Sequence, residues 1–293
     1  MEEHRPLLIA GPTASGKSAF AMQKAHESGG VIVNADSMQV YSQLRVLTAR
    51  PTEADEIALP HRLYGHVDIA HSYSVAQWLR DVEAELVSIS EAGQRLIIVG
   101  GTGLYFNALT MGLSPIPEID PEVRVHWRGQ ALELTPQELY AELSQRDPLT
   151  AATLRDSDPQ RLVRALEVIE STGRPLAQWQ TEPGVPLLAP GTWDGCVVCP
   201  ERDEIYARAD NRFEQMLDEG ALEEVEALKE LQLSPELPGM RALGVKPLMG
   251  YLDGVVSRED AVEAAKTQTR RYVKRQLTWL RRYMISENWL IIE

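Results

Sequence analysis

The chain has 293 residues, 44% of them hydrophobic, which is enough for one large domain or two modest ones with a proper core. Its 43 acidic and 29 basic residues give a net charge of −14, which taken alone argues against a polyanionic partner such as nucleic acid. Two cysteines exclude a disulfide framework. The acidic N-terminus does not resemble a signal peptide, and no run reaches the roughly 18 apolar residues of a membrane span. We therefore expect a cytoplasmic protein without a membrane segment.

The first third of the chain alternates predicted strands and helices. In chain order these are 7–10, 15–27, 31–35, 74–91 and 96–99, of which the second and fourth are helices. The longer helix starts with a capping box, in which Ser74 and Gln77 satisfy each other's backbone N–H groups, and Gly93 ends it. Because the strands are wholly apolar and alternate with helices, they predict a parallel sheet covered on both faces.

Only helices are predicted between about 121 and 180, and proline-rich joins flank this stretch. Thr135 and Glu138 form a capping box with proline at the first helical position. Asp158 starts another helix, which stops at Gly173. We expect an all-helical insertion domain inside an α/β domain. The boundaries that we expect are 115–185 for the insertion and 1–114 with 186–293 for the α/β core.

Elements of the α/β type are expected again after the insertion. They comprise a strand at 196–199 and helices at 204–217, 222–231 and 257–284. The strand contains Cys196 and Cys199 in a C-x-x-C pattern. No second pair of cysteines or clustered histidines accompanies it, so buried small side chains are a better interpretation than a zinc site.

A phosphate-loop pattern, G-x-x-x-x-G-K-[ST], lies between the first predicted strand and the first helix. In such loops backbone N–H groups and the helix N-terminus hold phosphate oxygens. Lys17 would reach the outer phosphates and Ser18 would ligate Mg²⁺. The residues of the loop are Gly11, Pro12, Thr13, Ala14, Ser15, Gly16, Lys17 and Ser18. The loop predicts binding of a ligand that carries phosphate groups.

The acidic residue that usually accompanies a phosphate loop is missing. Nucleoside triphosphatases use an acid at the end of a buried strand to hold Mg²⁺, whereas the strand at 96–99 runs into a Gly-Gly-Thr-Gly turn that contains Thr102. Asp36 instead follows the second strand, and the carboxyl ends of parallel strands line the ligand crevice. A carboxylate there would serve as a general base beside bound phosphates. The alternative is an ordinary turn or cap aspartate.

Five motifs occur in order over nearly the whole chain: GPTASGKS, DSMQVY, GGTGLY, DPQRLVRALEV and RALGVK. Together they resemble the tRNA dimethylallyltransferase (tRNA isopentenyltransferase) family. The resemblance implies a core related to the phosphate-loop kinases with a helical insertion. It also implies transfer of a dimethylallyl group from dimethylallyl diphosphate to N6 of the adenosine on the 3′ side of the anticodon. The implied partners are Mg²⁺, the donor and a tRNA anticodon stem-loop, and we expect a monomer.

The same resemblance implies roles for individual residues. The loop 11–18 binds the donor diphosphate, Asp36 takes the proton from N6, Thr102 contacts the reacting centre, and Arg212 holds the leaving diphosphate. The residues that match tRNA-contacting segments are Asp36, Ser37, Met38, Gln39, Arg124, Gln160, Arg161, Leu162, Val163, Arg164, Arg241, Ala242, Leu243, Gly244, Val245 and Lys246. Leu47 stands where the family often has glycine, and Val245 where many members have tyrosine. Neither departure removes a proposed catalytic group.

A window of the last predicted helix is basic and contains no acid. Its residues are Lys266, Arg270, Arg271, Lys274, Arg275, Arg281 and Arg282. Val273, Leu277 and Leu280, followed by Met284, form an apolar stripe that we expect to face the core. The remaining faces can lie against an RNA backbone. The alternative is a solvated basic helix whose charges pair with acidic neighbours.

Three other functions fit parts of the sequence. An adenylate isopentenyltransferase would prenylate free AMP, ADP or ATP by similar chemistry. A small-molecule kinase would use the same loop for ATP. A non-catalytic RNA-binding protein would retain the loop as scaffold only. The helical insertion and the basic C-terminal helix favour tRNA as the substrate.

Overall fold

The computed structural model describes residues 5–284 and 289–292. The chain divides into two compact units, Met1–Thr110 with Leu187–Glu293, and Met111–Pro186. We call the first the sheet unit and the second the helical unit. Within the described residues, no helix is both long enough and apolar enough to cross a membrane.

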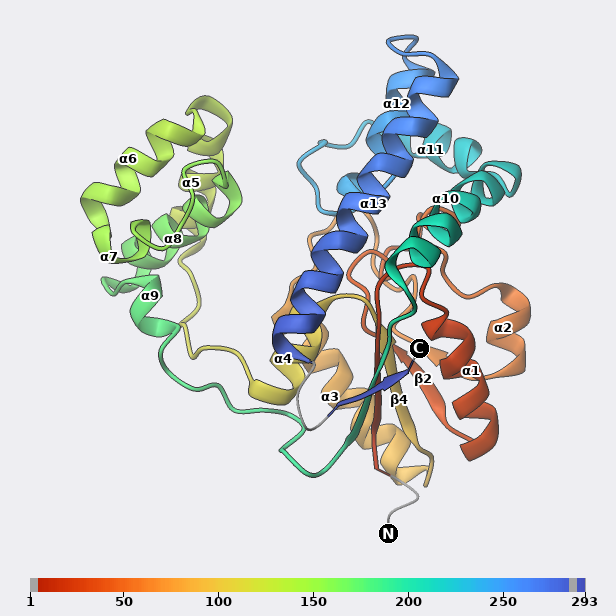
Figure 1. Ribbon diagram of the computed structural model, residues 1–293. Helices are drawn as coiled ribbons and strands as arrows, with labels where there is room; N and C mark the ends of the chain where they lie inside the picture. The colour runs from red at the N-terminus through yellow and green to blue at the C-terminus, as the bar shows by residue number, and fades with distance from the viewer. Residues whose placement is uncertain (1–4, 285–288, 293) are drawn as a thin grey trace. The chain divides into compact units, whose positions relative to one another are not determined.

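A parallel sheet forms the centre of the sheet unit (Figure 1). Across the sheet its strands are β3 (His61–Arg62), β2 (Val31–Asn34), β4 (Leu96–Gly100), β1 (Leu7–Ala10), β5 (Asp194–Val198) and β6 (Trp289–Ile292). Every neighbouring pair is parallel. The three central strands β2, β4 and β1 are wholly buried because helices cover both faces. The predicted α/β fold with a parallel sheet is therefore confirmed.

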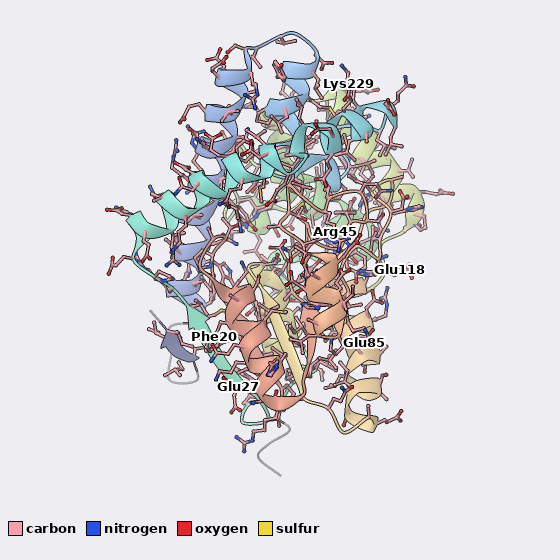
Figure 2. All side chains as sticks on the ribbon, turned by 90° about the vertical axis from the view of Figure 1, so that its right-hand side faces the viewer. Phe20, Glu27, Arg45, Glu85, Glu118 and Lys229 are labelled. Carbon is pink, nitrogen blue, oxygen red and sulfur yellow. The ribbon has the colours of Figure 1, made fainter. Side chains whose placement is uncertain are left out.

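Alternate residues of each strand pack against different helices. Leu8 faces the core that includes α3 (Val75–Glu91) and α4 (Gly103–Met111). Leu7 and Ile9 face the core that includes α1 (Lys17–Ser28). Figure 2 views the unit from the side of α1, where Phe20 and Glu27 are labelled. The alternation follows from the two-residue period of a strand.

The helices after β5 build a second core away from the sheet. They are α10 (Arg202–Asp218), α11 (Ala221–Glu230), a 3₁₀ turn (Gly239–Arg241), α12 (Val245–Leu252) and α13 (Arg258–Tyr283). Their apolar faces enclose Val40, Tyr41 and Leu44, which belong to the loop after β2. This loop leads to α2 (Glu53–Ala58), which starts with a capping box between Thr52 and Asp55. The loop that contains Asp36 is thus anchored by a core of its own.

All elements of the helical unit are helices. They are α5 (Pro121–Glu133), α6 (Pro136–Arg146), α7 (Pro148–Ala151), α8 (Pro159–Thr172) and α9 (Leu176–Trp179). The first four begin with proline after an aspartate or threonine whose side chain caps the helix. The α8 helix is central, since Leu162, Ala165 and Leu166 are fully buried.

Several short elements escaped prediction. His61 and its neighbour form β3 in a stretch for which we predicted no element, and β6, α2, α4 and α12 were not expected either. Predicted boundaries otherwise lie within about three residues of those observed, and the strand expected at 196–199 begins and ends earlier, as β5. Cys199 therefore lies just beyond the strand.

Among the described residues, no group of three or more His, Cys, Asp or Glu side chains is placed to hold a metal ion.

Candidate active site at the phosphate loop

The phosphate loop connects β1 to α1, as predicted. Gly16, with a φ of 91°, and Ala14, with a φ of 62°, adopt left-handed conformations that turn the chain into the helix. No acidic residue occupies the first turn of α1, so its N-terminus is open to an anion. The hydroxyl of Ser15 is buried and has no hydrogen-bond partner among the described residues. An anion in the loop would give this hydroxyl an acceptor.

Two cationic side chains meet at this loop. Lys17 donates from Nζ to the carbonyl of Pro12 at 3.2 Å. Arg212 reaches across from α10 and donates to the hydroxyl of Thr13. Burial lowers the pKa of Lys17 to about 8; the charge of Asp36 opposes this shift and that of Arg212 adds to it. Burial also lowers the pKa of Arg212, against the influence of Asp36. Two desolvated cationic groups with one carboxylate nearby favour an added anion.

The two carboxylate oxygens of Asp36 differ in their hydrogen bonds. Its Oδ1 accepts a hydrogen bond from the backbone N–H of Met38 at 2.9 Å, and its own N–H donates to Asn34 Oδ1 at 2.8 Å. No group in the described part of the chain donates to Oδ2. Asp36 lines a cavity. The turn interpretation is therefore confirmed for one oxygen, and the role of the other as a general base stays a prediction.

Thr102 joins the ends of two strands. Its hydroxyl accepts from the N–H of Ser37 at 3.0 Å and donates to the Ser37 hydroxyl at 3.3 Å. Tyr272, on α13, lies near Thr102, and burial and the charge of Asp36 raise the pKa of Tyr272. Thr102 does not itself line the cavity around Asp36. Its predicted contact with the reacting centre stays a prediction.

The cavity has a volume of about 230 Å³ and combines charged and apolar walls. Its lining residues are Thr13, Asp36, Ser37, Met38, Leu47, Thr48, Ala209, Arg212, Phe213, Met216, Arg241, Ala242, Leu243, Thr269, Tyr272 and Arg275. Arg212, Asp36 and Thr13 provide the charge and hydrogen bonds. Phe213, Met216 and several smaller side chains provide apolar surface. Such a mixture suits a small ligand with a charged head and a hydrocarbon tail.

Several other predicted residues near this cavity make contacts within the protein itself. Gln39 donates from its amide to the carbonyls of Thr48 and Ala49. Gly244 has a φ of 91°, and a Cβ there would lie 3.0 Å from Leu47 Cδ2. Leu47 therefore packs against a glycine, and its own φ is not positive. Val245 is 1% exposed, so its side chain cannot contact tRNA as expected, whereas Lys246 is exposed.

The remaining predicted tRNA contacts lie in the helical unit. Gln160 and Arg161 are exposed on α8, and Arg164 is partly exposed with an ion pair to Glu167 at 3.6 Å. Leu162 and Val163 are buried in the core of the unit, because they occupy the inner face of α8. Their side chains are not available for RNA, which corrects that part of the expectation. Arg124 is partly buried, and its Nε has no hydrogen-bond partner in the part of the chain that is described.

The basic window of α13 divides into two groups. Lys266 pairs with Glu214, and Arg270 pairs with Asp210 at 2.7 Å and with Glu263 at 2.7 Å. The exposed residues without an acidic partner among the described residues are Arg271, Lys274, Arg275, Arg281 and Arg282. The apolar stripe faces the core as predicted, with no member more than 5% exposed. Pairing with acidic neighbours is confirmed for Lys266 and Arg270. RNA contact by the exposed group stays a prediction.

Sequence reasoning missed several residues of the site. Tyr272 lines the cavity, and the basic window gave no reason to single it out. Arg208 lies one turn before Arg212 on α10, and its Nη1 is 3.9 Å from where a Cβ on Gly16 would be. Their four-residue spacing on one helix face was the available signal. Gln276 contacts the loop through hydrogen bonds that no local pattern indicates.

Comparison with known proteins decides the family. The family described as IPP transferase matches residues 39–283. The chain belongs to the IPP transferase family. A relative from Bradyrhizobium sp. (strain ORS 278), named tRNA dimethylallyltransferase, is 49% identical over 99% of this chain and 94% of its own length. A tRNA dimethylallyltransferase from Bartonella tribocorum is 50% identical over 97% of each chain.

Solved structures of IPP transferases share the fold. The tRNA isopentenylpyrophosphate transferase from Bacillus halodurans is 32% identical, with a TM-score of 0.69 over 99% of this chain and 89% of that one. A eukaryotic dimethylallyltransferase described as acting on tRNA is 26% identical, with a TM-score of 0.77 over 94% of this chain and 70% of that one. The resemblance inferred from the five motifs is confirmed.

Proposed function

We propose that the chain transfers a dimethylallyl group from dimethylallyl diphosphate to N6 of the adenosine on the 3′ side of the anticodon in tRNA. Membership of the IPP transferase family supports transfer of a prenyl group to tRNA. The observation that carries the finer assignment is the single cavity shared by Asp36, Thr13 and Arg212. The Asp36 carboxylate, the Arg212 guanidinium and Thr13 of the phosphate loop line one space.

The phosphate loop is proposed to hold the diphosphate as a leaving group. Lys17, Arg212 and the N–H groups at the start of α1 would take up the charge that develops as the bond between the prenyl carbon and the diphosphate oxygen breaks. Mg²⁺ would neutralise part of that charge. Ser18 is exposed in the first turn of α1 and offers one ligand, so the diphosphate and water would supply most of the others.

Asp36 is proposed to activate the nucleophile. The lone pair of an exocyclic adenine amine is delocalised into the ring, so the amine attacks well only as its proton leaves. Oδ2 of Asp36 would accept that proton while the nitrogen forms its bond to the prenyl carbon and the diphosphate departs. Oδ1 stays bonded to Met38 and fixes the direction of the carboxylate.

The tRNA is proposed to approach along the exposed basic residues of α13. Arg275 is both exposed on this helix and part of the cavity wall, so it can contact the RNA backbone where the base enters. The target base must leave its stack, and this costs less in a single-stranded anticodon loop. In the helical unit, Arg124, Gln160, Arg161 and Arg164 are proposed to contact the RNA. A monomer in the cytoplasm stays a prediction.

The deciding experiment combines the protein, Mg²⁺, dimethylallyl diphosphate and total tRNA, and identifies modified nucleosides by mass spectrometry. We expect N6-isopentenyladenosine from the wild type. Asp36→Asn keeps an oxygen for the Met38 hydrogen bond but removes the base, so turnover should fall by about 10²–10⁴-fold at unchanged melting temperature. Turnover close to wild type would show that Asp36 is not the base.

Three outcomes would replace the proposal. Equal activity on free AMP and on tRNA would indicate an adenylate isopentenyltransferase. Transfer of labelled γ-phosphate from ATP without prenyl transfer would indicate a kinase. Binding of tRNA with no product, unaffected by Asp36→Asn, would indicate an RNA-binding protein.

A further inference from the structure

A single glutamine joins the two glycine-containing turns of the site. Gln276 lies on α13 and is only 6% exposed. Its Oε1 accepts a hydrogen bond from the backbone N–H of Thr13 at 2.9 Å. Its Nε2 donates to the carbonyl of Gly101 at 2.9 Å. One side chain thus connects the phosphate loop, the turn after β4 and the basic helix.

The space beside Gly101 gives a second, independent observation in favour of this bridge. A Cβ added there would lie 2.4 Å from Gln276 Nε2 and 3.2 Å from the carbonyl oxygen of Gly11. The first distance is too short for any real contact, so the glutamine amide occupies the space that a side chain at 101 would need. The glycine therefore makes room for the bridge.

The chemistry of the bridge requires an amide. The Thr13 N–H needs an acceptor and the Gly101 carbonyl needs a donor, and an amide offers both from one planar group. A glutamate of the same shape would place an acceptor against the carbonyl, and methionine would satisfy neither partner. Because the Thr13 N–H is bonded to Gln276, it is withdrawn from phosphate binding, while the Thr13 hydroxyl accepts from Arg212.

We propose that Gln276 is a positioning residue for the donor site, which rests on the function proposed above. It fixes Thr13, and through Thr13 the direction of Arg212, relative to the turn that carries Thr102. Tyr272 and Arg275, one turn before and directly before Gln276 on α13, line the same cavity. The helix proposed to receive tRNA therefore also sets the geometry of the phosphate loop.

The test measures binding of inorganic pyrophosphate with Mg²⁺ to the full chain by calorimetry, and the KM for each substrate. We expect Gln276→Met to weaken pyrophosphate binding and raise the donor KM by about tenfold, the value of one to two hydrogen bonds. Gln276→Glu should have a larger effect, because it adds negative charge beside the diphosphate. The KM for tRNA should change less than about twofold, because the buried side chain of Gln276 offers little surface to the RNA.

A double-mutant cycle and a control variant distinguish a positioning role of Gln276 from a general loss of protein stability. Gly101→Ala should weaken pyrophosphate binding in the wild type and much less in a Gln276→Ala background, where the space is free. Leu280→Val truncates a core residue of the same helix and should lower the melting temperature but leave pyrophosphate affinity unchanged. Equal loss of affinity in Leu280→Val, or wild-type affinity in both Gln276→Met and Gln276→Glu, overturns the inference. Failure of the wild type to bind pyrophosphate would instead overturn the proposed donor site.

Discussion

Lys17 is a buried amine whose pKa is lowered to about 8 from its ordinary value of 10.5. Between these two values the unfolded chain binds a proton that the folded protein does not, so folding stability rises with pH through that window. Below pH 8 the lysine is charged in both states, and its buried charge is destabilising throughout.

The predicted rise of folding stability with pH can be tested by removing the Lys17 amine. The free energy of unfolding of wild type relative to Lys17→Met should be constant below pH 8 and increase from pH 8 to 10.5. Denaturant unfolding at several pH values measures it. Lys24→Met, which removes a lysine of the same helix that pairs with Glu27 at 2.7 Å, is the matched control for the loss of a lysine. A flat difference for Lys17→Met would mean that its amine is not desolvated.

The loop between β2 and α2 is held by a side chain of a distant helix. Glu224 on α11 accepts hydrogen bonds from three consecutive backbone N–H groups, those of Arg45, Val46 and Leu47, at 2.7, 2.8 and 3.0 Å. Arg45 itself reaches Glu56 of α2 at 3.0 Å and is labelled in Figure 2. Leu47, which this carboxylate positions, lines the cavity.

Glu224→Gln should therefore destabilise the protein although it keeps the shape of the side chain. The amide nitrogen would face an N–H group and leave it unpaired, for a loss of about 1–3 kcal/mol in the free energy of unfolding. Glu223→Gln, an exposed neighbour on the same helix, should change stability little. Chemical denaturation compares the two, and equal stability of both variants would contradict the role of the carboxylate.

The two groups of charges on α13 predict different phenotypes. The double variant Arg271→Gln, Lys274→Gln removes exposed charges and should weaken tRNA binding. A plot of the logarithm of tRNA affinity against the logarithm of salt concentration should also be less steep for this variant. The slope should decrease by about one for each phosphate that the variant no longer neutralises. Lys266→Gln breaks the pair with Glu214 and should leave tRNA binding nearly unchanged. Fluorescence anisotropy over a salt series measures both. Identical slopes in the double variant and wild type would place the RNA elsewhere.

Elements with a local signal could be predicted from the sequence. The phosphate loop has its motif, α3 and α8 have caps and a clear end, and α13 has an apolar stripe. β3 was missed because two residues carry no pattern, and α4 because its sequence GLYFNALTM is apolar on most sides. Gln276 could not be predicted, because its partners lie 263 and 175 residues away in the sequence.

At the scale of the whole molecule, the chain segment that enters the helical unit lies beside the segment that leaves it. The N–H of Leu188 donates to the carbonyl of Leu109 at 3.0 Å within the sheet unit. Within the helical unit, a Cβ on Gly112 would lie 2.5 Å from the backbone of Gly184. Both junctions bring the two chain segments together, so the insertion can be removed without stretching the sheet unit.

Replacing residues 113–183 by a short glycine–serine linker should leave a folded sheet unit. We expect pyrophosphate affinity within about threefold of wild type, because the hydrogen bonds of the phosphate loop described above lie within that unit. Affinity for tRNA should fall, because Arg161 and Arg164, which we propose to bind the RNA, are removed. Calorimetry and tRNA binding measure the two effects, and unchanged tRNA affinity would remove the helical unit from RNA recognition.

The order of the strands has a consequence for synthesis on the ribosome. β1 is made first, yet in the sheet it lies between β4 and β5, so it is bordered on both sides only after residue 198 exists. The glutamine that fixes the loop after β1 appears at position 276. A nascent chain therefore carries the phosphate motif without this glutamine until residue 276 has been made. Full donor affinity should appear only after that residue has left the exit tunnel.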